Sequence, residues 1–318
     1  MVDVTLIGTG ALQPLPARAL ASAAIICGGR VLLLDCGEGT QSAARRAGVS
    51  LVKIDVIALT HYHGDHTYGL PGLLQSMAMA ERVEPVYIFG PEGLEAAMKP
   101  FMMLCGRLPF ELRLMELDDQ GVELADLIHG WMQGARIQSF ATYHRMPSQG
   151  YRFELRRNGQ FMPERARELG VPVTQWKLLQ RGERINVDGK PVLPEQVMSA
   201  PRRGISVAYT GDTAWHADMA QHMQDTDLLI CEATYGENEQ EALAKEHGHM
   251  TFAQAAHLAQ AAQVHELWLT HYSPMITDPQ EYLKNAACYF EQTFCGADGM
   301  VKALRFDKKP NIREKSVI

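Results

Sequence analysis

Several absences in this chain of 318 residues narrow its class. No apolar run is long enough to cross a bilayer, and no basic segment precedes the first apolar run, "VTLIG". A transmembrane helix and a signal peptide are therefore not expected. CxxC pairs and internal repeats are also missing, so we expect reduced core cysteines rather than a disulfide framework at Cys27, Cys36, Cys105, Cys231, Cys288 and Cys295. These absences predict a cytoplasmic enzyme.

Acidic residues outnumber basic ones, 37 to 30, but the basic residues are concentrated in one segment. The net charge is −7 and the pI is about 5.9, which by itself argues against nucleic acid as a partner. Residues 145–203, however, hold twelve Lys or Arg and six acids, which leaves −13 for the rest of the chain. This basic segment fits either a surface that follows phosphates or an ordinary solvated arm.

The order of apolar runs predicts two sheets with helices outside them. The segment 22–39 predicts two strands joined by a turn at Gly28-Gly29, because paired glycines favour a tight hairpin. Further strands are expected at 2–8, 54–60, 85–90, 110–117, 135–144, 150–155, 205–213, 227–234, 266–271 and 300–306. Helices are expected at 38–47, 69–83, 91–105, 251–263 and 279–294. Residues 156–200 lose this periodicity and predict an inserted arm, and 308–318 predict a loose tail.

Three histidines and an aspartate lie within six positions of the segment "IDVIALTHYHGDHTYGLPGLL", directly after a predicted buried strand. Neither a strand nor a helix would bring His61, His63, Asp65 and His66 together. We therefore expect a tight loop, with Gly64 supplying a permissive backbone. A merely polar loop would explain one or two histidines. Four such groups favour a metal site, with zinc first and manganese or iron as alternatives.

Three more polar residues end apolar runs in the same way: His144, Asp212 and His271. Each alone would be an ordinary cap or turn residue. Together with the first cluster they make seven ligands, which suffice for two metal ions. One ion can be held by His61, His63 and His144, and the other by Asp65, His66 and His271, with Asp212 bridging the two.

With these spacings, "THYHGDH" resembles the motif of the metallo-β-lactamase superfamily. Within it, the chain is most similar to the ribonuclease Z family. The shared blocks are "DCGEGTQ" (35–41), "GLPGLL" (69–74), "FGPEGL" (89–94), "GYRFE" (150–154) and "EAT" (232–234). The resemblance implies an α/β fold, an αββα four-layer sandwich. It would form one domain over residues 1–307, with the basic arm inserted at about 156–200.

The resemblance also implies an activity. It is that of a zinc-dependent endoribonuclease with two Zn²⁺ per subunit, which removes 3′ trailers from precursor tRNA and leaves a 3′-hydroxyl. Mn²⁺ or Fe²⁺ are the alternative ions. Asp65 would handle the proton of the nucleophile, and Glu232 and His249 would assist the leaving 3′ oxygen. A homodimer and no membrane partner are expected.

Some positions depart from the family pattern. Cys231 replaces a histidine before Glu232, and Met250 follows His249, which could instead cap the helix expected at 251. In the arm, Val173-Thr174-Gln175 replace a Gly-Pro element, and the front loop 14–22 lacks an Arg-Asn pair. Trp176 could stack on a base or anchor the arm. A hydrolase of small phosphodiesters or other small esters, and a binding protein with a degenerate metal centre, are the alternative functions.

Overall fold

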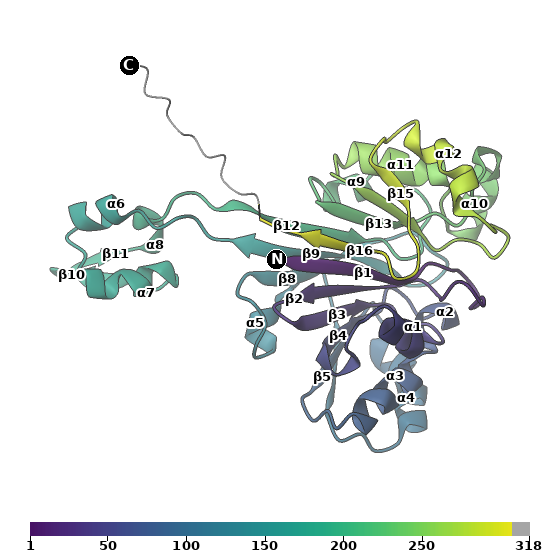
Figure 1. The fold of residues 1–318 in the computed structure, drawn as a ribbon. Helices are drawn as coiled ribbons and strands as arrows, with labels where there is room; N and C mark the ends of the chain where they lie inside the picture. The colour runs from purple at the N-terminus through teal and green to yellow at the C-terminus, as the bar shows by residue number, and fades with distance from the viewer. Residues whose placement is uncertain (307–318) are drawn as a thin grey trace. The chain divides into compact units, whose positions relative to one another are not determined.

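Two seven-stranded sheets lie face to face in the larger part of the chain (Figure 1). The computed structural model describes residues 1–306, and the tail predicted at 308–318 lies outside the described residues. The first sheet has the order β16-β1-β2-β3-β4-β5-β6. Its strands are β1 (Val2–Gly8), β2 (Ser22–Cys27), β3 (Arg30–Leu34), β4 (Ile54–Ala58), β5 (Val86–Gly90), β6 (Leu112–Glu116) and β16 (Val301–Leu304).

The second sheet has the order β15-β14-β13-β12-β9-β8-β7. Its strands are β7 (Val122–Glu123), β8 (Ala135–Ala141), β9 (Gln149–Arg157), β12 (Arg202–Tyr209), β13 (Leu228–Glu232), β14 (Leu267–Thr270) and β15 (Thr293–Cys295). Strands β12 to β15 pair in parallel, as do β3 to β6 in the first sheet. Parallel strands place their carboxyl ends at one edge, and this edge holds the candidate site.

Helices cover the outer face of each sheet. The helices of this part are α1 (Thr40–Arg46), α2 (Gly64–Thr67), α3 (Leu70–Met79), α4 (Leu94–Cys105), α5 (Leu124–Leu127), α9 (Met219–His222), α10 (Glu241–His247), α11 (Phe252–Ala261) and α12 (Lys284–Ala287). Single 3₁₀ turns occur at Leu51–Lys53, Asn238–Gln240 and Pro279–Tyr282. Pro71 lies in the first turn of α3, where proline is tolerated.

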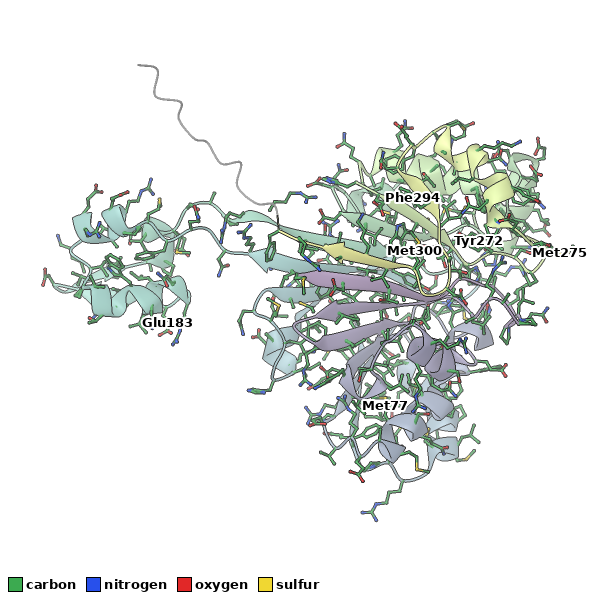
Figure 2. All side chains as sticks on the ribbon, viewed as in Figure 1. Met77, Glu183, Tyr272, Met275, Phe294 and Met300 are labelled. Atoms are coloured by element: carbon green, nitrogen blue, oxygen red, sulfur yellow. The ribbon has the colours of Figure 1, made fainter. Side chains whose placement is uncertain are left out.

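Three apolar cores separate the four layers. The core between the sheets combines side chains such as Val4 and Val56 with Phe153 and Trp268. A second core lies between the first sheet and α1, α3 and α4, and a third between the second sheet and α9, α11 and α12. Met77 of α3 is fully buried in the second core, whereas Met275 extends into solvent (Figure 2). This layering is the predicted αββα sandwich, so the expectation of fold class is confirmed.

Local sequence explains two elements that position the site. Gly28 and Gly29 have φ values of 61° and 81°, so the β2–β3 turn uses the left-handed backbone that glycine adopts most readily. All five residues of β4 are buried, as expected of a parallel strand covered on both faces. Because β4 ends at Ala58, the loop that follows it, which contains His61, lies at the carboxyl edge of the sheet.

Residues 156–204 form a separate compact unit. Its elements are α6 (Pro163–Glu168), a 3₁₀ turn (Val173–Gln175), α7 (Trp176–Gln180), β10 (Ile185–Val187), β11 (Lys190–Val192) and α8 (Pro194–Val197). Its own core contains Ala166, Leu179 and Val197. Trp176 is half-buried, packs against Phe161 and donates its indole N–H to the Val171 carbonyl at 3.1 Å. Trp176 is thus an anchor of this unit.

Two expectations about local structure are wrong. The helix expected at 279–294 is instead a 3₁₀ turn, the short helix α12 and strand β15, because residues 293–295 pair with β14 and extend the sheet. Five cysteines are buried and unpaired as expected, but Cys288 is exposed. Within residues 1–306, no helix combines the length and apolar composition that a bilayer crossing requires.

Candidate metal centre

Strand ends from both sheets bring the predicted ligands together. Asp35 follows β3, and His61 follows β4 at the same edge of the first sheet. On the second sheet, Asp212 follows β12 and His271 follows β14. The φ of His271 is 58°, an uncommon backbone for a residue other than glycine, and such conformations are concentrated at functional sites.

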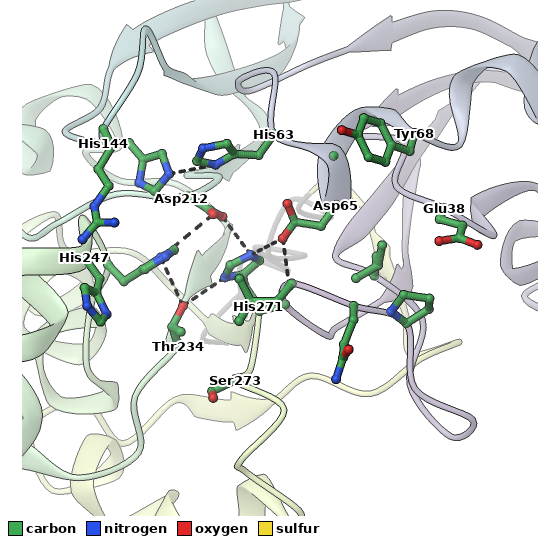
Figure 3. A pocket seen from close by; sticks show the side chains of 18 of the residues that line it. Glu38, His63, Asp65, Tyr68, His144, Asp212, Thr234, His247, His271 and Ser273 are labelled. Atoms are coloured by element: carbon green, nitrogen blue, oxygen red, sulfur yellow. Dashed lines mark hydrogen bonds and ion pairs between the residues drawn. The ribbon is translucent and has the colours of Figure 1, made fainter.

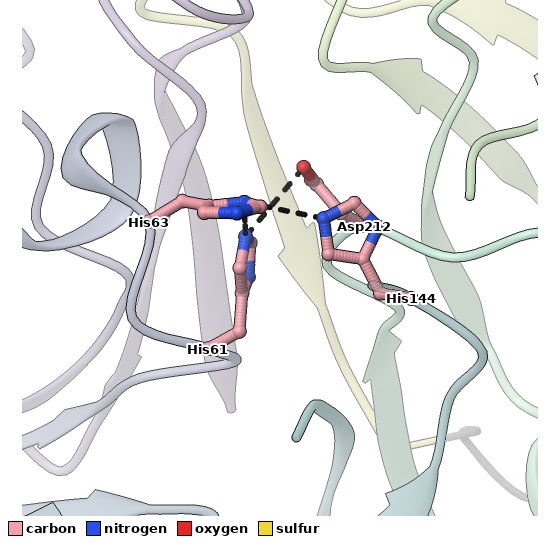
Figure 4. A group of neighbouring side chains, drawn as sticks. All are labelled: His61, His63, His144 and Asp212. Carbon is pink, nitrogen blue, oxygen red and sulfur yellow. Dashed lines mark hydrogen bonds and ion pairs between the residues drawn. The ribbon is translucent and has the colours of Figure 1, made fainter. Parts of the chain in front are cut away.

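The first group of donor atoms is formed by His61, His63, His144 and Asp212 (Figure 4). Nδ1 of His63 lies 3.0 Å from Nε2 of His61 and 3.2 Å from Nε2 of His144. Nε2 of His61 lies 3.7 Å from Oδ2 of Asp212. The structure thus assembles the predicted first set and adds one oxygen of Asp212 to it.

The second group is formed by Asp65, His66 and His271. Nε2 of His66 lies 3.3 Å from Nε2 of His271, and both nitrogens lie 3.7 Å from Oδ2 of Asp65. This is the second set that the sequence predicted.

Asp212 faces both groups. Its Oδ2 is directed at the first, and its Oδ1 lies 3.3 Å from Nε2 of His66 and 3.1 Å from Nε2 of His271. Oδ1 is buried and accepts no hydrogen bond within residues 1–306. A buried carboxylate oxygen that lacks a hydrogen bond is expected to have another partner, and a cation between the groups would be one. Asp212 therefore lies between the two groups, with one oxygen directed at each.

The donor spacing also fits divalent ions. Four ligands at about 2.0–2.1 Å around a tetrahedral Zn²⁺ lie about 3.3 Å from one another. The distances between neighbouring donor atoms within the two groups run from 3.0 Å to 3.7 Å. Several of these pairs are imidazole nitrogens that point at each other, an arrangement that a shared cation stabilises. The residues present therefore fit divalent metal ions.

Four of these histidines also have a hydrogen-bond partner at Nδ1, the ring nitrogen that faces away from the donor groups. Nδ1 of His66 lies 2.8 Å from Asp35, whose carboxylate accepts hydrogen bonds from Thr60 and Tyr209 as well. The remaining partners are Thr60 Oγ1 for His61, the Gly248 carbonyl for His144 and Thr234 Oγ1 for His271. Such contacts fix the tautomer and orientation of metal-binding histidines. Asp35 is not among the residues predicted for the site, although it follows a buried strand just as Asp212 does.

Burial controls the protonation of the first group. It lowers the pKa of His61, of His63 and of His144, which favours the neutral imidazole that binds a cation. Burial also opposes the charged forms of His66 and Asp212. The Asp212 and Asp35 carboxylates outweigh burial and raise the pKa of His66, while His271 and His66 outweigh it and lower the pKa of Asp212.

The histidine-rich segment is only partly the predicted loop. His61 and His63 precede the one-turn helix α2, which contains Asp65 and His66. Gly64 has no left-handed φ in this structure. A Cβ at Gly64 would lie 2.4 Å from the Tyr68 ring, so close approach rather than backbone freedom explains the glycine. The expectation for Gly64 is corrected accordingly.

Glu232 and His249 form a buried pair beside the two groups. Nδ1 of His249 lies 2.8 Å from Oε1 of Glu232, which also accepts from the Thr213 amide, while Oε2 accepts from Thr234 and the Met250 amide. Burial opposes a charge on His249, but the Glu232 carboxylate raises its pKa to about 9. His249 also lies close enough to Asp212 and His271 for a third potential ligand set.

Two departures from the family pattern leave this pair intact. Cys231 is buried in the core beneath α11, whereas the contacts of Glu232 lie at the strand end. The cap of α11 is Thr251, whose hydroxyl accepts from the Gln254 amide. The alternative that His249 caps this helix is therefore wrong.

A cavity of about 720 Å³ opens over the groups (Figure 3). His63, Asp65, His144, Asp212, His249 and His271 line it. The cavity leaves room for a substrate next to the donor atoms.

Replacing Asp35 with asparagine is expected to weaken metal binding about 10–100-fold, because the orientation of His66 is lost. Competition with a chromogenic chelator measures this affinity. Asp55→Asn is the matched control, since Asp55 is equally buried but pairs with Arg30, Arg82 and Trp131 away from the site. Equal metal affinity of Asp35→Asn and wild type would contradict the orienting role.

Known proteins resemble this chain in sequence. Residues 2–151 match a family model described as "Anti-Pycsar protein Apyc1", and residues 197–272 match one described as "Beta-lactamase superfamily domain". The ribonuclease Z of Lachnospira eligens is 41% identical over 307 residues, covering 96% of this chain and 99% of that protein. That of Clostridium perfringens is 39% identical over 316 residues, covering 97% and 100%.

Solved structures show the same fold. The crystal structure of human tRNase Z, short form, has a TM-score of 0.67 and 26% identity, covering 96% of this chain and 100% of that one. The metallo-β-lactamase fold protein YhfI from Bacillus subtilis has a TM-score of 0.66 and 20% identity, covering 95% and 98%. With relatives near 40% identity over almost its whole length, the chain belongs to the ribonuclease Z family.

Proposed function

We propose that this protein is a metal-dependent endoribonuclease that removes 3′ trailers from precursor tRNA. The main observation is Asp212, whose two oxygens face two separate groups of donor atoms in a chain of the ribonuclease Z family. Human tRNase Z, a protein of the same fold, supports tRNA as the substrate. A binding protein with a degenerate centre is disfavoured, because all seven predicted ligands come together.

The residues have distinct roles in the proposed reaction. Divalent ions, when bound, would supply Lewis-acid stabilisation of the phosphate charge. Burial opposes the ionised form of Asp65, but His271 and His66 lower its pKa, so this carboxylate stays ionised and can orient an attacking water by accepting a hydrogen bond from it. The amide of Leu12 donates to Asp65 Oδ2 at 2.8 Å and holds it in place. His249, protonated beside Glu232, can donate a proton to the leaving 3′ oxygen.

The ions and the assembly belong to the same proposal. We infer two zinc ions per subunit, with Mn²⁺ or Fe²⁺ as the alternatives, because imidazole and carboxylate donors suit all three. We also infer a cytoplasmic homodimer, on the basis of the family alone. Metal analysis of the purified protein tests the first inference, and its mass in solution tests the second.

The unit 156–204 is proposed to bind the body of the tRNA. It holds ten Lys or Arg and five acids on a small independent core. Val173, where the family resemblance implies a Gly-Pro element, is exposed. Excising residues 158–201 and joining the ends with a short Gly-Ser linker should lower kcat/KM for precursor tRNA on the order of 100-fold, since phosphate contacts are lost. End-labelled precursor tRNA measures this rate, and bis(p-nitrophenyl) phosphate serves as a substrate without a tRNA body.

The two substrates separate the proposed function from its alternative. The variant that lacks residues 158–201 should still hydrolyse the small diester, because every predicted ligand lies outside this range. If wild type hydrolyses the small diester but leaves precursor tRNA intact, the alternative of a small-phosphodiester hydrolase is correct instead.

A further inference from the structure

One wall of the cavity has donor groups that the proposed reaction does not use. Arg145, Tyr235 and His247 line the cavity, although none belongs to the two ligand groups. Arg145 directly follows His144, and His247 ends helix α10. The wall thus presents a guanidinium and an imidazole to whatever occupies the cavity.

Hydrogen bonds hold both side chains. Arg145 donates from Nη2 to the Glu246 carbonyl at 3.0 Å, which ties it to the residue before His247. The Tyr235 hydroxyl lies 2.6 Å from Nδ1 of His247. Since Nδ1 is engaged, Nε2 is the ring nitrogen through which His247 can meet a ligand. A fork of N–H donors and a fixed imidazole suit a phosphate group.

The charge of the cavity is polarised. Glu38 lines the opposite side, and Figure 3 shows His247 and Glu38 at opposite ends with Asp212 and His271 between them. A second phosphate of a bound polynucleotide would be repelled by the carboxylate and attracted by the guanidinium. The polynucleotide backbone should therefore continue from the site towards Arg145.

The direction of the strand follows from His249. This side chain, the proposed donor to the leaving 3′ oxygen, lies with its ring centre 5.2 Å from that of His144 and 6.4 Å from that of Tyr235. The nucleotide that leaves through its 3′ oxygen is the one upstream of the cut. Its own 5′ phosphate is then the group nearest to the wall of Arg145 and His247.

We propose that Arg145 and His247 bind the phosphate on the 5′ side of the nucleotide upstream of the scissile bond. This inference rests on the proposed phosphodiesterase function and adds a subsite to it. The ligand is a phosphate one nucleotide away from the cut, in whichever RNA supplies it. The downstream phosphate lies outside this subsite.

Three dinucleotides test the subsite in the metal-loaded protein. They are ApA, pApA with an added 5′ phosphate, and ApAp with an added 3′ phosphate, each used as an inhibitor of bis(p-nitrophenyl) phosphate hydrolysis. For wild type, the inhibition constant of pApA should be about tenfold lower than that of ApA, as expected for one charge-assisted phosphate contact. ApAp should inhibit no better than ApA.

Variants assign the effect to the wall. The preference for pApA is the inhibition constant of ApA divided by that of pApA. Arg145→Gln and His247→Gln should each reduce this ratio, and Arg145→Gln should bring it close to one. Arg145→Lys should retain part of it, because the charge remains. Lys245→Gln is the matched control. Lys245 is an exposed cation of α10, the helix that also contains His247, but it does not line the cavity.

The outcomes are separable from those of the proposed function. An inhibition constant for pApA no lower than that for ApA, or a preference that survives in Arg145→Gln, would overturn the subsite. Stronger inhibition by ApAp than by ApA would mean that the cavity binds a phosphate downstream of the scissile bond, contrary to the proposal. Failure to cleave precursor tRNA would remove the proposed function, yet it would leave the measured preference for pApA unchanged.

Discussion

Asp212→Ala is expected to abolish most of the hydrolysis of any phosphodiester, with a fall in kcat of at least about a thousand-fold, since metal ions contribute several kcal/mol of charge stabilisation. Asp212 has one oxygen facing each group of donors. Its loss also removes the carboxylate oxygen that lies 3.3 Å from Nε2 of His66 and 3.1 Å from Nε2 of His271. The variant should therefore bind fewer divalent ions as well as react more slowly.

Metal analysis and kinetics on the same preparation measure both effects. Asp218→Ala provides the control, because Asp218 is an exposed acid a few residues further along the same segment. Circular dichroism should show that both variants are folded. A fully active Asp212→Ala protein with an undiminished metal content would contradict the bridging role.

His249→Ala is expected to have the second-largest effect, and the effect should depend on the substrate. General acid catalysis contributes about 10²–10⁴-fold, so kcat for precursor tRNA should fall by this factor. The 3′ oxygen of RNA is a poor leaving group that needs a proton. p-Nitrophenolate is a good one, so hydrolysis of bis(p-nitrophenyl) phosphate should fall far less.

The metal content distinguishes this role from that of a ligand. His249 can also approach Asp212 and His271, so a ligand role would lower the metal content of His249→Ala. A proton donor would leave it at the wild-type value. His265→Ala is a suitable control, because His265 is an exposed histidine whose ion pair with Asp225 is remote from the donor groups. Equal losses of rate for the two substrates would contradict the role of proton donor.

The ligands could be predicted because strand ends are visible in a sequence. His144 follows β8, which pairs antiparallel with β9. Buried strands lead to Asp212 and His271, and the parallel pairing of β12, β13 and β14 brings their carboxyl ends to one edge. Asp35 follows the same rule, but it contacts Nδ1 of His66 rather than the donor groups. Only the three-dimensional packing separates a ligand from the residue that orients it.

The errors of prediction also have physical causes. Residues 279–294 have helical composition, yet pairing with β14 imposes a strand on Thr293–Cys295. Gly64 is required by the nearby Tyr68 ring, a contact that propensity does not reveal. In the unit 156–204, short elements around Leu179 and Val197 form a core too small to produce a clear periodicity.

Mapping both ends of the cut in a precursor tRNA tests the central claim most directly. The metal-loaded protein should cut once near the 3′ end of the acceptor stem, leaving a 3′-hydroxyl on the tRNA and a 5′-phosphate on the trailer. Adding a chelator should stop the reaction. A 2′,3′-cyclic phosphate at the new end would contradict the account, because the RNA 2′-hydroxyl rather than water would then be the nucleophile. An intact precursor, incubated with protein that hydrolyses bis(p-nitrophenyl) phosphate, would equally contradict it.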